Sequence, residues 1–203
     1  MALVQSGNLL GEHPMRSGDG FGHVLYGELE NFLADKDVRL EQIQCFAAAS
    51  GPGSFTGVRV GLAAIKGLAE ATGKPAIAVS NLCAMAYHGS AKFRAAVLDA
   101  RRDEVYGGLY SSSLELIGEE TVSKLSDWLR SLPATNLELI TTDFAPFAGL
   151  VNPAIPVVTT PRLLAAAVGQ IASRLFELGK AVDPAAIDAN YVRRSDAEML
   201  WRK

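Results

Sequence analysis

A glycine-rich turn leading into a long run of small and apolar residues constrains the fold of this chain more than any other feature. The stretch reads GPGSFTGVRVGLAAIKGLA and covers residues 51–69. The apolar residues 43–48 before it predict a buried strand, and the pattern after it predicts a helix over residues 58–72 that ends at Gly73. A strand, a glycine turn and a helix in this order indicate an α/β fold.

The rest of the sequence extends this pattern into two lobes, residues 1–92 and 93–203. In the first lobe we expect further strands at residues 1–4, 9–12 and 76–79 and further helices at residues 21–35 and 82–87. In the second lobe we expect strands at residues 94–99, 104–110, 114–119 and 137–142 and helices at residues 124–132 and 161–178. The last helix is predicted to start at Pro161, because proline favours the first turn of a helix.

Composition limits the classes of function. The chain has 203 residues, of which 49% are hydrophobic, and a net charge of −3. It shows no basic face, so we expect no strong direct binding to tRNA or DNA. We find neither a membrane-spanning run nor a signal peptide, and Cys45 and Cys83 lie in apolar surroundings that predict buried thiols. These features predict a cytoplasmic protein without membrane contact.

The glycine turn has the pattern of an anion-binding loop, because backbone N–H groups and the helix dipole point at a ligand at a helix start. The residues that would form this nucleotide or phosphate turn are Gly51, Gly53, Ser54, Thr56 and Gly57. Ser54 and Thr56 could either cap the helix or bind phosphate oxygens. The glycine spacing fits neither a P-loop nor the Rossmann fingerprint. In an alternative interpretation the turn only lets the helix pack close to the sheet, with Gly61 and Gly67 serving the same purpose.

No catalytic or metal-binding residue is predicted. The stretch GSFTG lacks the spacing of a serine nucleophile elbow. The three histidines, His13, His23 and His88, lack the spacing of a metal pair on a helix. The charged residues 99–104 surround a predicted hairpin turn, which favours a solvated turn with local ion pairs over acid–base chemistry.

Three stretches together are specific enough to indicate a family. They are ASGPGSFTGVRVGLAAIKGLA at residues 49–69, GKPAIAVSNLCAMA at residues 73–86 and LDARRDEVYGGLY at residues 98–110. Their combination closely resembles the TsaB family, also called YeaZ, and the tail DPAAIDANYVRR at residues 183–194 fits it as well. The family motif of the second lobe comprises Asp99, Arg101, Arg102, Glu104 and Tyr106.

This resemblance implies the two-lobed fold of actin, sugar kinases and ribonuclease H. It implies a non-catalytic scaffold in the synthesis of threonylcarbamoyladenosine in tRNAs that read ANN codons. The partners would be the paralogous catalytic subunit TsaD, which the chain would activate, and the ATPase TsaE. The chain alone would form a homodimer. The resemblance implies no cofactor required by this chain, and any ATP or ADP would bind at the partner interface.

Comparison with the paralogous catalytic subunit implies that this chain is not itself an enzyme. The catalytic relative carries a His-x-x-x-His metal pair after its glycine turn, and the corresponding positions here are Asn81 and Met85. Neither side chain offers the imidazole ligand that such a metal site uses. The same observation counts against the older glycoprotease label of such sequences, because a metalloprotease needs its metal.

Partner contact in the family runs through the first two helices of the N-terminal lobe. The residues that would form this interface are His23, Tyr26, Arg59, Gly61, Ala64, Gly67 and Ala71. Small residues at three- and four-residue spacing let another helix approach closely. We expect Val60, Ala63 and Leu68, on the other side of the second helix, to face the sheet.

The sequence departs from the family at its start. TsaB-like chains open with a strand and an Asp-Thr-Ser phosphate loop, whereas residues 1–4 here resemble the end of the second strand. We therefore expect an N-terminal lobe that lacks its first strand, and we favour a start at an internal Met of a longer protein over a shortened chain.

An alternative function is a free-standing ATPase or small-molecule kinase of the actin-like superfamily. Such an enzyme needs a catalytic Asp and metal-binding acidic loops in both lobes. Only Asp99 comes near such a place in this sequence.

Overall fold

The chain forms two units in a computed structural model that describes residues 1–15, 22 and 24–193. Unit 1 holds Met1–Ser50, Ser54–Asn81 and Leu163–Ala189. Unit 2 holds Gly51–Gly53, Leu82–Arg162 and the segment from Asn190 onward. Residues 163–189, which the sequence-based division assigned to the second lobe, therefore pack in the first.

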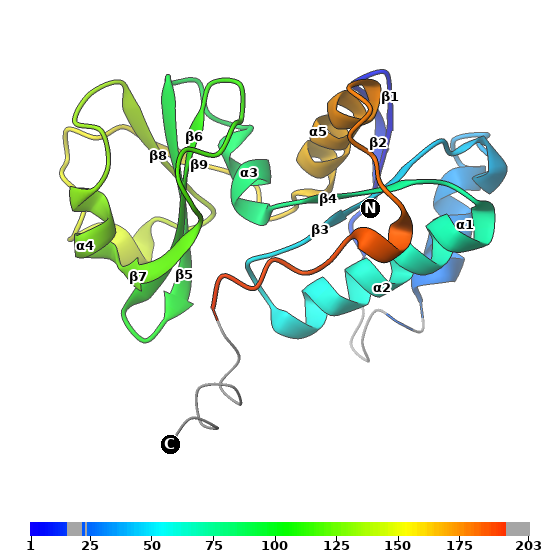
Figure 1. The fold of residues 1–203 in the computed structure, drawn as a ribbon, viewed down its shortest axis with the longest axis horizontal. Coiled ribbons are helices and arrows are strands. Elements are labelled where there is room, and N and C mark those ends of the chain that lie inside the picture. Colours follow the sequence, from blue (N-terminus) through cyan, green and yellow to red (C-terminus); the bar gives the residue numbers. More distant parts are fainter. Residues whose placement is uncertain (16–21, 23, 194–203) are drawn as a thin grey trace. The chain divides into compact units, whose positions relative to one another are not determined.

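The strands of unit 1 form two separate two-stranded ladders (Figure 1). Strands β1 (Ala2–Gln5) and β2 (Asn8–Glu12) pair antiparallel, and strands β3 (Phe46–Ala49) and β4 (Ala76–Val79) pair parallel. Within the residues that the structure describes, no hydrogen-bonded strand joins the two ladders.

The described part of unit 1 also contains the helices α1 (Leu25–Ala34), α2 (Phe55–Thr72) and α5 (Ala165–Glu177). The 3-10 turns η2 (Leu40–Gln42) and η4 (Pro184–Ala186) belong to it as well. The predicted start of α1 at residue 21 lies outside the described residues. No helix in the described part of the chain is long and apolar enough to cross a lipid bilayer.

Helix α2 begins three residues before the predicted position because Ser54 caps it. The Ser54 hydroxyl accepts a hydrogen bond from the Gly57 N–H at 3.3 Å. The predicted C-cap is confirmed, since Gly73 has a left-handed φ of 64°. The sheet-facing side consists of residues at helical spacing that pack with Phe46 and Ala48: Val58, Leu62, Ile65, Leu68 and Ala69.

The predicted sheet-facing side of α2 is therefore only partly right. Leu68 packs in the core, but Ala63 is exposed. The helix has two weakly apolar sides, and alanine and glycine do not indicate which of them is buried.

Helix α5 begins four residues after the predicted start at Pro161. The helix packs on β1 and β2, where a Cβ at Gly169 would lie 2.8 Å from a methyl carbon of Val4. The Glu12 carboxylate accepts the Ala166 N–H at 3.0 Å in the first turn of α5. Helix α5 also contacts β3 and β4, so one helix covers parts of both ladders.

Unit 2 is built on a five-stranded sheet in the order β7-β6-β5-β8-β9. Its helices are α3 (Asn81–Ala86) and α4 (Leu125–Arg130), and η3 (Ala145–Phe147) is a 3-10 turn. Its strands are β5 (Phe93–Arg101), β6 (Glu104–Ser111), β7 (Thr121–Lys124), β8 (Leu137–Thr141) and β9 (Val157–Thr159). Strands β5, β6 and β7 pair antiparallel, whereas β5, β8 and β9 pair parallel.

The predicted strand at residues 114–119 is wrong. That segment contributes only an isolated bridge between Tyr110 and Leu116, and the third antiparallel strand is β7 instead. Gly118 has a φ of 80°, which interrupts an extended strand at this point. Strand β9 was not predicted, because three residues are too few for a periodic pattern.

The core of unit 2 joins the sheet to α4 through Trp128. This indole is 7% exposed and lies directly against the backbone of Gly107 on β6. The buried residues around it include Val97, Val105, Leu125 and Leu139. Glycine at position 107 leaves the space that the indole ring fills.

Both cysteines are held as neutral thiols. Burial raises the pKa of Cys45 from 9.0 to about 11. Burial, and to a smaller degree the charge of Glu120, raise the pKa of Cys83 to about 11 as well. The sequence predicted buried thiols, whereas both cysteines are half-buried in the structure.

We predict that Gly107→Ala destabilises the protein by about 1–3 kcal/mol, because the new methyl group overlaps the Trp128 indole. Gly61→Ala in α2 is the matched control, since a Cβ there has nothing within 4 Å. That change should stabilise by about 0.5–1 kcal/mol, as alanine is a better helix former than glycine. Urea unfolding of both variants measures the difference, and equal effects would contradict the packing described here.

We predict that Cys45 and Cys83 react with iodoacetamide about a hundredfold more slowly in the folded protein than in the urea-unfolded chain at pH 8. The thiolate is the reactive form, so raised pKa values lower the rate. The rate should rise about tenfold for each pH unit up to about 11. Equal rates in the folded and unfolded states would show that the thiols are not protected.

Candidate functional site

The chain passes from unit 1 to unit 2 and back again within the glycine turn. Gly51 has a left-handed φ of 98°, and the Gly51–Pro52 peptide bond is cis. Gly51–Gly53 group with unit 2, and the chain rejoins unit 1 at Ser54. Ser54 is the N-cap of α2, which is one of the two roles predicted for it. A Cβ at Gly57 would lie 3.4 Å from the Ser54 side chain, which is an ordinary contact distance.

Helices α1 and α2 present a shared surface, which we call the α1–α2 face: Tyr26, Gly61, Ala64, Gly67 and Ala71. Tyr26 is 56% exposed, and its hydroxyl lies 4.0 Å from where a Cβ of Gly67 would be. Gly67 and Ala71 are exposed, whereas Gly61 and Ala64 are half-buried. Of the residues predicted for the partner interface, His23 lies outside the described residues.

Among the described residues, three glycines of α1 and α2 have no close internal neighbour: Gly27, Gly61 and Gly67. A Cβ at Gly27 or Gly61 would meet nothing within 4 Å, and a Cβ at Gly67 would meet only the Tyr26 hydroxyl at its ordinary contact distance. The interpretation that Gly61 and Gly67 let the helix pack close to the sheet is therefore wrong. Gly67 is exposed and Gly61 half-buried, and among the described residues each has room for a side chain.

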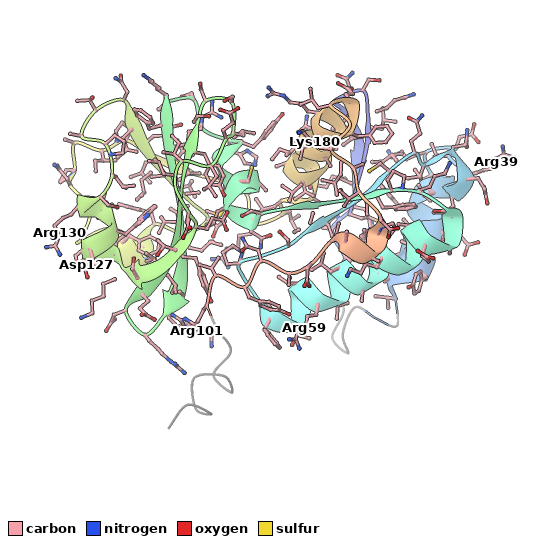
Figure 2. All side chains as sticks on the ribbon, in the orientation of Figure 1. Arg39, Arg59, Arg101, Asp127, Arg130 and Lys180 are labelled. Atoms are coloured by element: carbon pink, nitrogen blue, oxygen red, sulfur yellow. The ribbon has the colours of Figure 1, made fainter. Side chains whose placement is uncertain are left out.

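Arg59 lies over the ring of Phe55 at the start of α2, with its guanidinium carbon 3.6 Å from the ring centroid. Figure 2 labels Arg59 at this end of the helix. Phe55 is 49% exposed. The sequence predicted Arg59 for the interface but not Phe55, because residue 55 was assigned to the turn before the helix. The spacing of four residues could have indicated the pair once the earlier helix start was known.

The motif of the second lobe forms the end of the β5–β6 hairpin. Arg102 and Asp103 are the two loop residues between the paired positions Arg101 and Glu104. Arg101, Arg102 and Asp103, which we call the hairpin tip, have left-handed φ values of 62°, 58° and 60°. Such a conformation costs about 1–2 kcal/mol for each residue that is not glycine. The Asp99 carboxylate accepts the Arg101 N–H at 2.7 Å, so it fixes the turn.

Arg193 braces the same hairpin from the tail of the chain. Its guanidinium pairs with the Glu104 carboxylate and donates to the Ala100 carbonyl at 3.1 Å. It also lies 5.7 Å from the centroid of the Tyr106 ring. The sequence placed Glu104 and Tyr106 in one motif and Arg193 in the tail, but it gave no sign that the two stretches meet.

The carboxylates of Glu138 and Glu120 in unit 2 serve the fold. Glu138 is 4% exposed and accepts the N–H groups of Ser90 and Ala91 at 2.5 and 2.8 Å. Glu120 accepts the Tyr110 hydroxyl and the Asn190 amide with its two oxygens. Among the described residues, no group of three His, Cys, Asp or Glu side chains could hold a metal ion.

Asn81 and Met85 are the positions where the resemblance puts the metal pair of the catalytic relative. Asn81 is the first residue of α3, and Met85 is fully buried in the same helix. A buried thioether in a packed helix contributes apolar contacts.

A sequence model of the TsaD family, described as tRNA N6-adenosine threonylcarbamoyltransferase, matches residues 10–173. The chain is 43% identical over 82 residues to the tRNA threonylcarbamoyladenosine biosynthesis protein TsaB of Haemophilus influenzae, covering 38% of this chain and 35% of that protein. It is 36% identical over 109 residues to TsaB of Bacillus subtilis, covering 51% of this chain and 48% of that protein. In these alignments the chain spans less than half the length of either relative.

The fold has a solved relative over nearly its whole length. The structure of YeaZ from Pseudomonas aeruginosa matches with a TM-score of 0.79 and 26% identity, covering 94% of this chain and 92% of that one. This match confirms the two-lobed, actin-like α/β fold that the sequence predicted. The chain belongs to the TsaD-type threonylcarbamoyltransferase family, in which it is a member of the TsaB (YeaZ) group.

Proposed function

We propose that this chain is a non-catalytic subunit in the biosynthesis of threonylcarbamoyladenosine in tRNA, where it binds and activates a TsaD-type catalytic subunit through the α1–α2 face. The TsaB relatives are named for this pathway. The observation that carries the proposal is the open backbone at Gly27, Gly61 and Gly67.

Glycine inside a helix is unfavourable unless its missing side chain is used. Each such residue costs about 0.5–1 kcal/mol relative to alanine. No internal neighbour uses the space at Gly61 in the described structure. A helix of a partner can use it, because small residues let two helix axes approach closely. Exposed Tyr26 at the edge of the strip supplies a large contact of the kind that anchors protein interfaces.

The residues at the positions where catalytic or metal-binding groups would be expected have structural roles. Asp99, the candidate acid of the alternative kinase or ATPase function, holds the backbone of the β5–β6 hairpin and lies on an exposed turn. Met85, the position where the resemblance puts a metal ligand of the catalytic relative, is fully buried in the core. These observations support an accessory role over a free-standing enzyme.

The further partners follow from the same proposal. We infer that the chain alone forms a homodimer through the α1–α2 face, and that a TsaE-type ATPase joins the heterodimer. The chain itself would require no cofactor, and any ATP or ADP would bind where the catalytic subunit joins it. A stable one-to-one complex in nucleotide-free buffer, seen by size-exclusion chromatography with light scattering, would support this assignment.

We predict that Gly67→Arg weakens the complex with the cognate TsaD-type subunit at least about tenfold, because a long charged side chain would stand in the helix–helix contact. Gly149→Arg is the matched control. It introduces the same side chain at an exposed glycine of unit 2 whose Cβ position is also open. Isothermal titration calorimetry gives the affinities, and circular dichroism confirms that both variants fold.

Three outcomes separate the proposal from its alternative. Loss of binding in Gly67→Arg with full binding in Gly149→Arg supports the α1–α2 face. Full binding in both variants would remove this face from the interface. A folded wild-type chain that forms no complex at all would favour the free-standing enzyme.

A further inference from the structure

We propose that unit 1 binds one extended peptide strand of another protein, which pairs through its main chain with the unpaired edges of β1 and β3. We call these the inner edges: Ala2 and Val4 on β1, and Ala47 and Ala49 on β3. The inference is independent of the proposed function, because it concerns the strands of unit 1 and not the α1–α2 face.

The backbone of β1 is paired with β2 on one side only. Met1 and His13 exchange backbone hydrogen bonds of 2.7 and 2.8 Å. Bonded and non-bonded positions alternate in an antiparallel ladder, so the next residue, Ala2, directs its N–H and C=O away from β2. The two-residue turn to β2 follows Gln5, which is the bonded position there, so Val4 also points away from β2. No hydrogen bond among the described residues uses these groups of Ala2 and Val4.

The backbone of β3 is paired with β4 in the same one-sided way. The N–H groups of Phe46 and Ser50 donate hydrogen bonds of 3.1 and 2.8 Å on the β4 side. Alternate residues of a strand direct their backbone groups to opposite sides, so Ala47 and Ala49 direct theirs away from β4. In the described part of the chain, no hydrogen bond uses these groups either.

Both inner edges belong to strands that pack on the same helix. Helix α5 contacts all four strands of unit 1, and a Cβ at Gly169 would lie 2.8 Å from Val4. No pairing joins β1 and β3 within the described residues, so they do not stand at the spacing of about 4.8 Å that neighbouring strands have. The far edge of β4 is already occupied, because Val182 and Ala76 exchange backbone hydrogen bonds. One further strand paired with both inner edges would join the two ladders into a single sheet on α5.

An extended polypeptide is the ligand that matches these backbone groups. Its own N–H and C=O groups alternate between its two sides, so one strand can pair with two neighbours. The four residues of the inner edges are half-buried, and backbone groups removed from water without partners lower the stability. Exposed strand edges bind extended peptides by this kind of main-chain pairing in other proteins.

The surroundings of the inner edges favour an apolar strand. Helix α5 packs on one face of the ladders. On the other face, α2 packs on β3 through Phe46 and Ala48, and a Cβ at Gly11 of β2 would lie 3.3 Å from Phe32 of α1. Strands that are covered on both faces are apolar throughout and rich in valine and isoleucine. We therefore expect a segment of this composition to bind best.

A second copy of this chain is the competing source of such a strand. Strand β4, with the sequence AIAV, has the required composition, but it is paired with β3 in its own unit. A second copy would have to break that ladder to donate β4. A segment of a different protein has no such cost, and the proposal names that source.

The test uses a synthetic peptide, KKVIVIVKK amide, and the full chain labelled with nitrogen-15. The lysines keep the peptide in solution, and the central five residues supply the apolar strand. At a peptide concentration of about ten times its Kd, we expect hydrogen exchange of the Val4, Ala47 and Ala49 amides to slow about tenfold. Exchange is followed residue by residue by NMR, and the affinity is measured by isothermal titration calorimetry.

A peptide of the same sequence with N-methyl groups on alternate central residues is the control. The methyl groups remove the N–H donors of one side and leave the side chains unchanged. We expect it to bind at least about tenfold more weakly, because the bonds to one of the two ladders are lost. Equal affinity of the two peptides would show that main-chain pairing does not hold the strand, and would overturn the proposal.

Ala47→Pro tests the same site from the side of the protein. Proline removes the N–H of residue 47, which β4 does not use, and we expect at least about tenfold weaker peptide binding. Thr159→Pro is the matched control on β9. The Thr160 N–H donates to the Thr141 carbonyl on β8 at 2.8 Å, so the N–H of Thr159 points away from that sheet. Circular dichroism shows whether each variant folds, and the comparison of the two peptides in the wild type decides the outcome if Ala47→Pro does not.

The remaining outcomes are equally distinct. Slower exchange at both Val4 and Ala47 supports one strand between the ladders. Slower exchange at only one of them, or no binding up to about 1 mM peptide, overturns this site. Without peptide, exchange at these amides that slows as the protein concentration rises would assign the inner edges to a second copy, and would overturn the proposal of a different protein.

Discussion

Packing of helix α5 against both two-stranded ladders is the interaction on which unit 1 depends. A two-stranded ladder is marginally stable by itself in water. The helix is tied to the first ladder by the close contact of Gly169 with Val4 and by the bonds of Glu12 to Ala166 and of Gly7 to Ser173. The chain leaving the helix then pairs with the second ladder, where Val182 and Ala76 exchange backbone hydrogen bonds. One helix thus connects two ladders between which the described structure has no strand pairing.

The sequence predicted most helices and strands because their residues repeat at clear spacings. Helix α2 and its cap at Gly73, the turn between β1 and β2, and the β5–β6 hairpin all follow local rules. Local rules cannot assign a helix to a sheet, so the prediction placed α5 with the wrong strands. They also cannot choose between apolar segments of similar length, which is why residues 114–119 were predicted as a strand in place of β7.

The candidate sites show the same division between local and distant information. The motif residues Asp99, Arg101 and Glu104 were found because they lie close together in the sequence. Arg193 was not connected to them, since its contact with Glu104 joins residues 89 positions apart. The small residues of α2 were also found from sequence. Only the structure shows that no described residue lies within 4 Å of a Cβ at Gly61, and the proposal of a partner surface is based on this observation.

The order of the segments along the chain has a consequence for how the protein is made. Leu82–Arg162, which contains every strand of the five-stranded sheet, lies between two parts of unit 1. On the ribosome every strand of this inserted sheet is synthesised before α5. Domains generally fold as units while the chain emerges, so the inserted sheet can fold first. Strands β1 to β4 are synthesised before the helix that packs on them, because α5 begins more than eighty residues after the end of β4. Nascent unit 1 is therefore the part of the molecule that most needs protection from aggregation during translation.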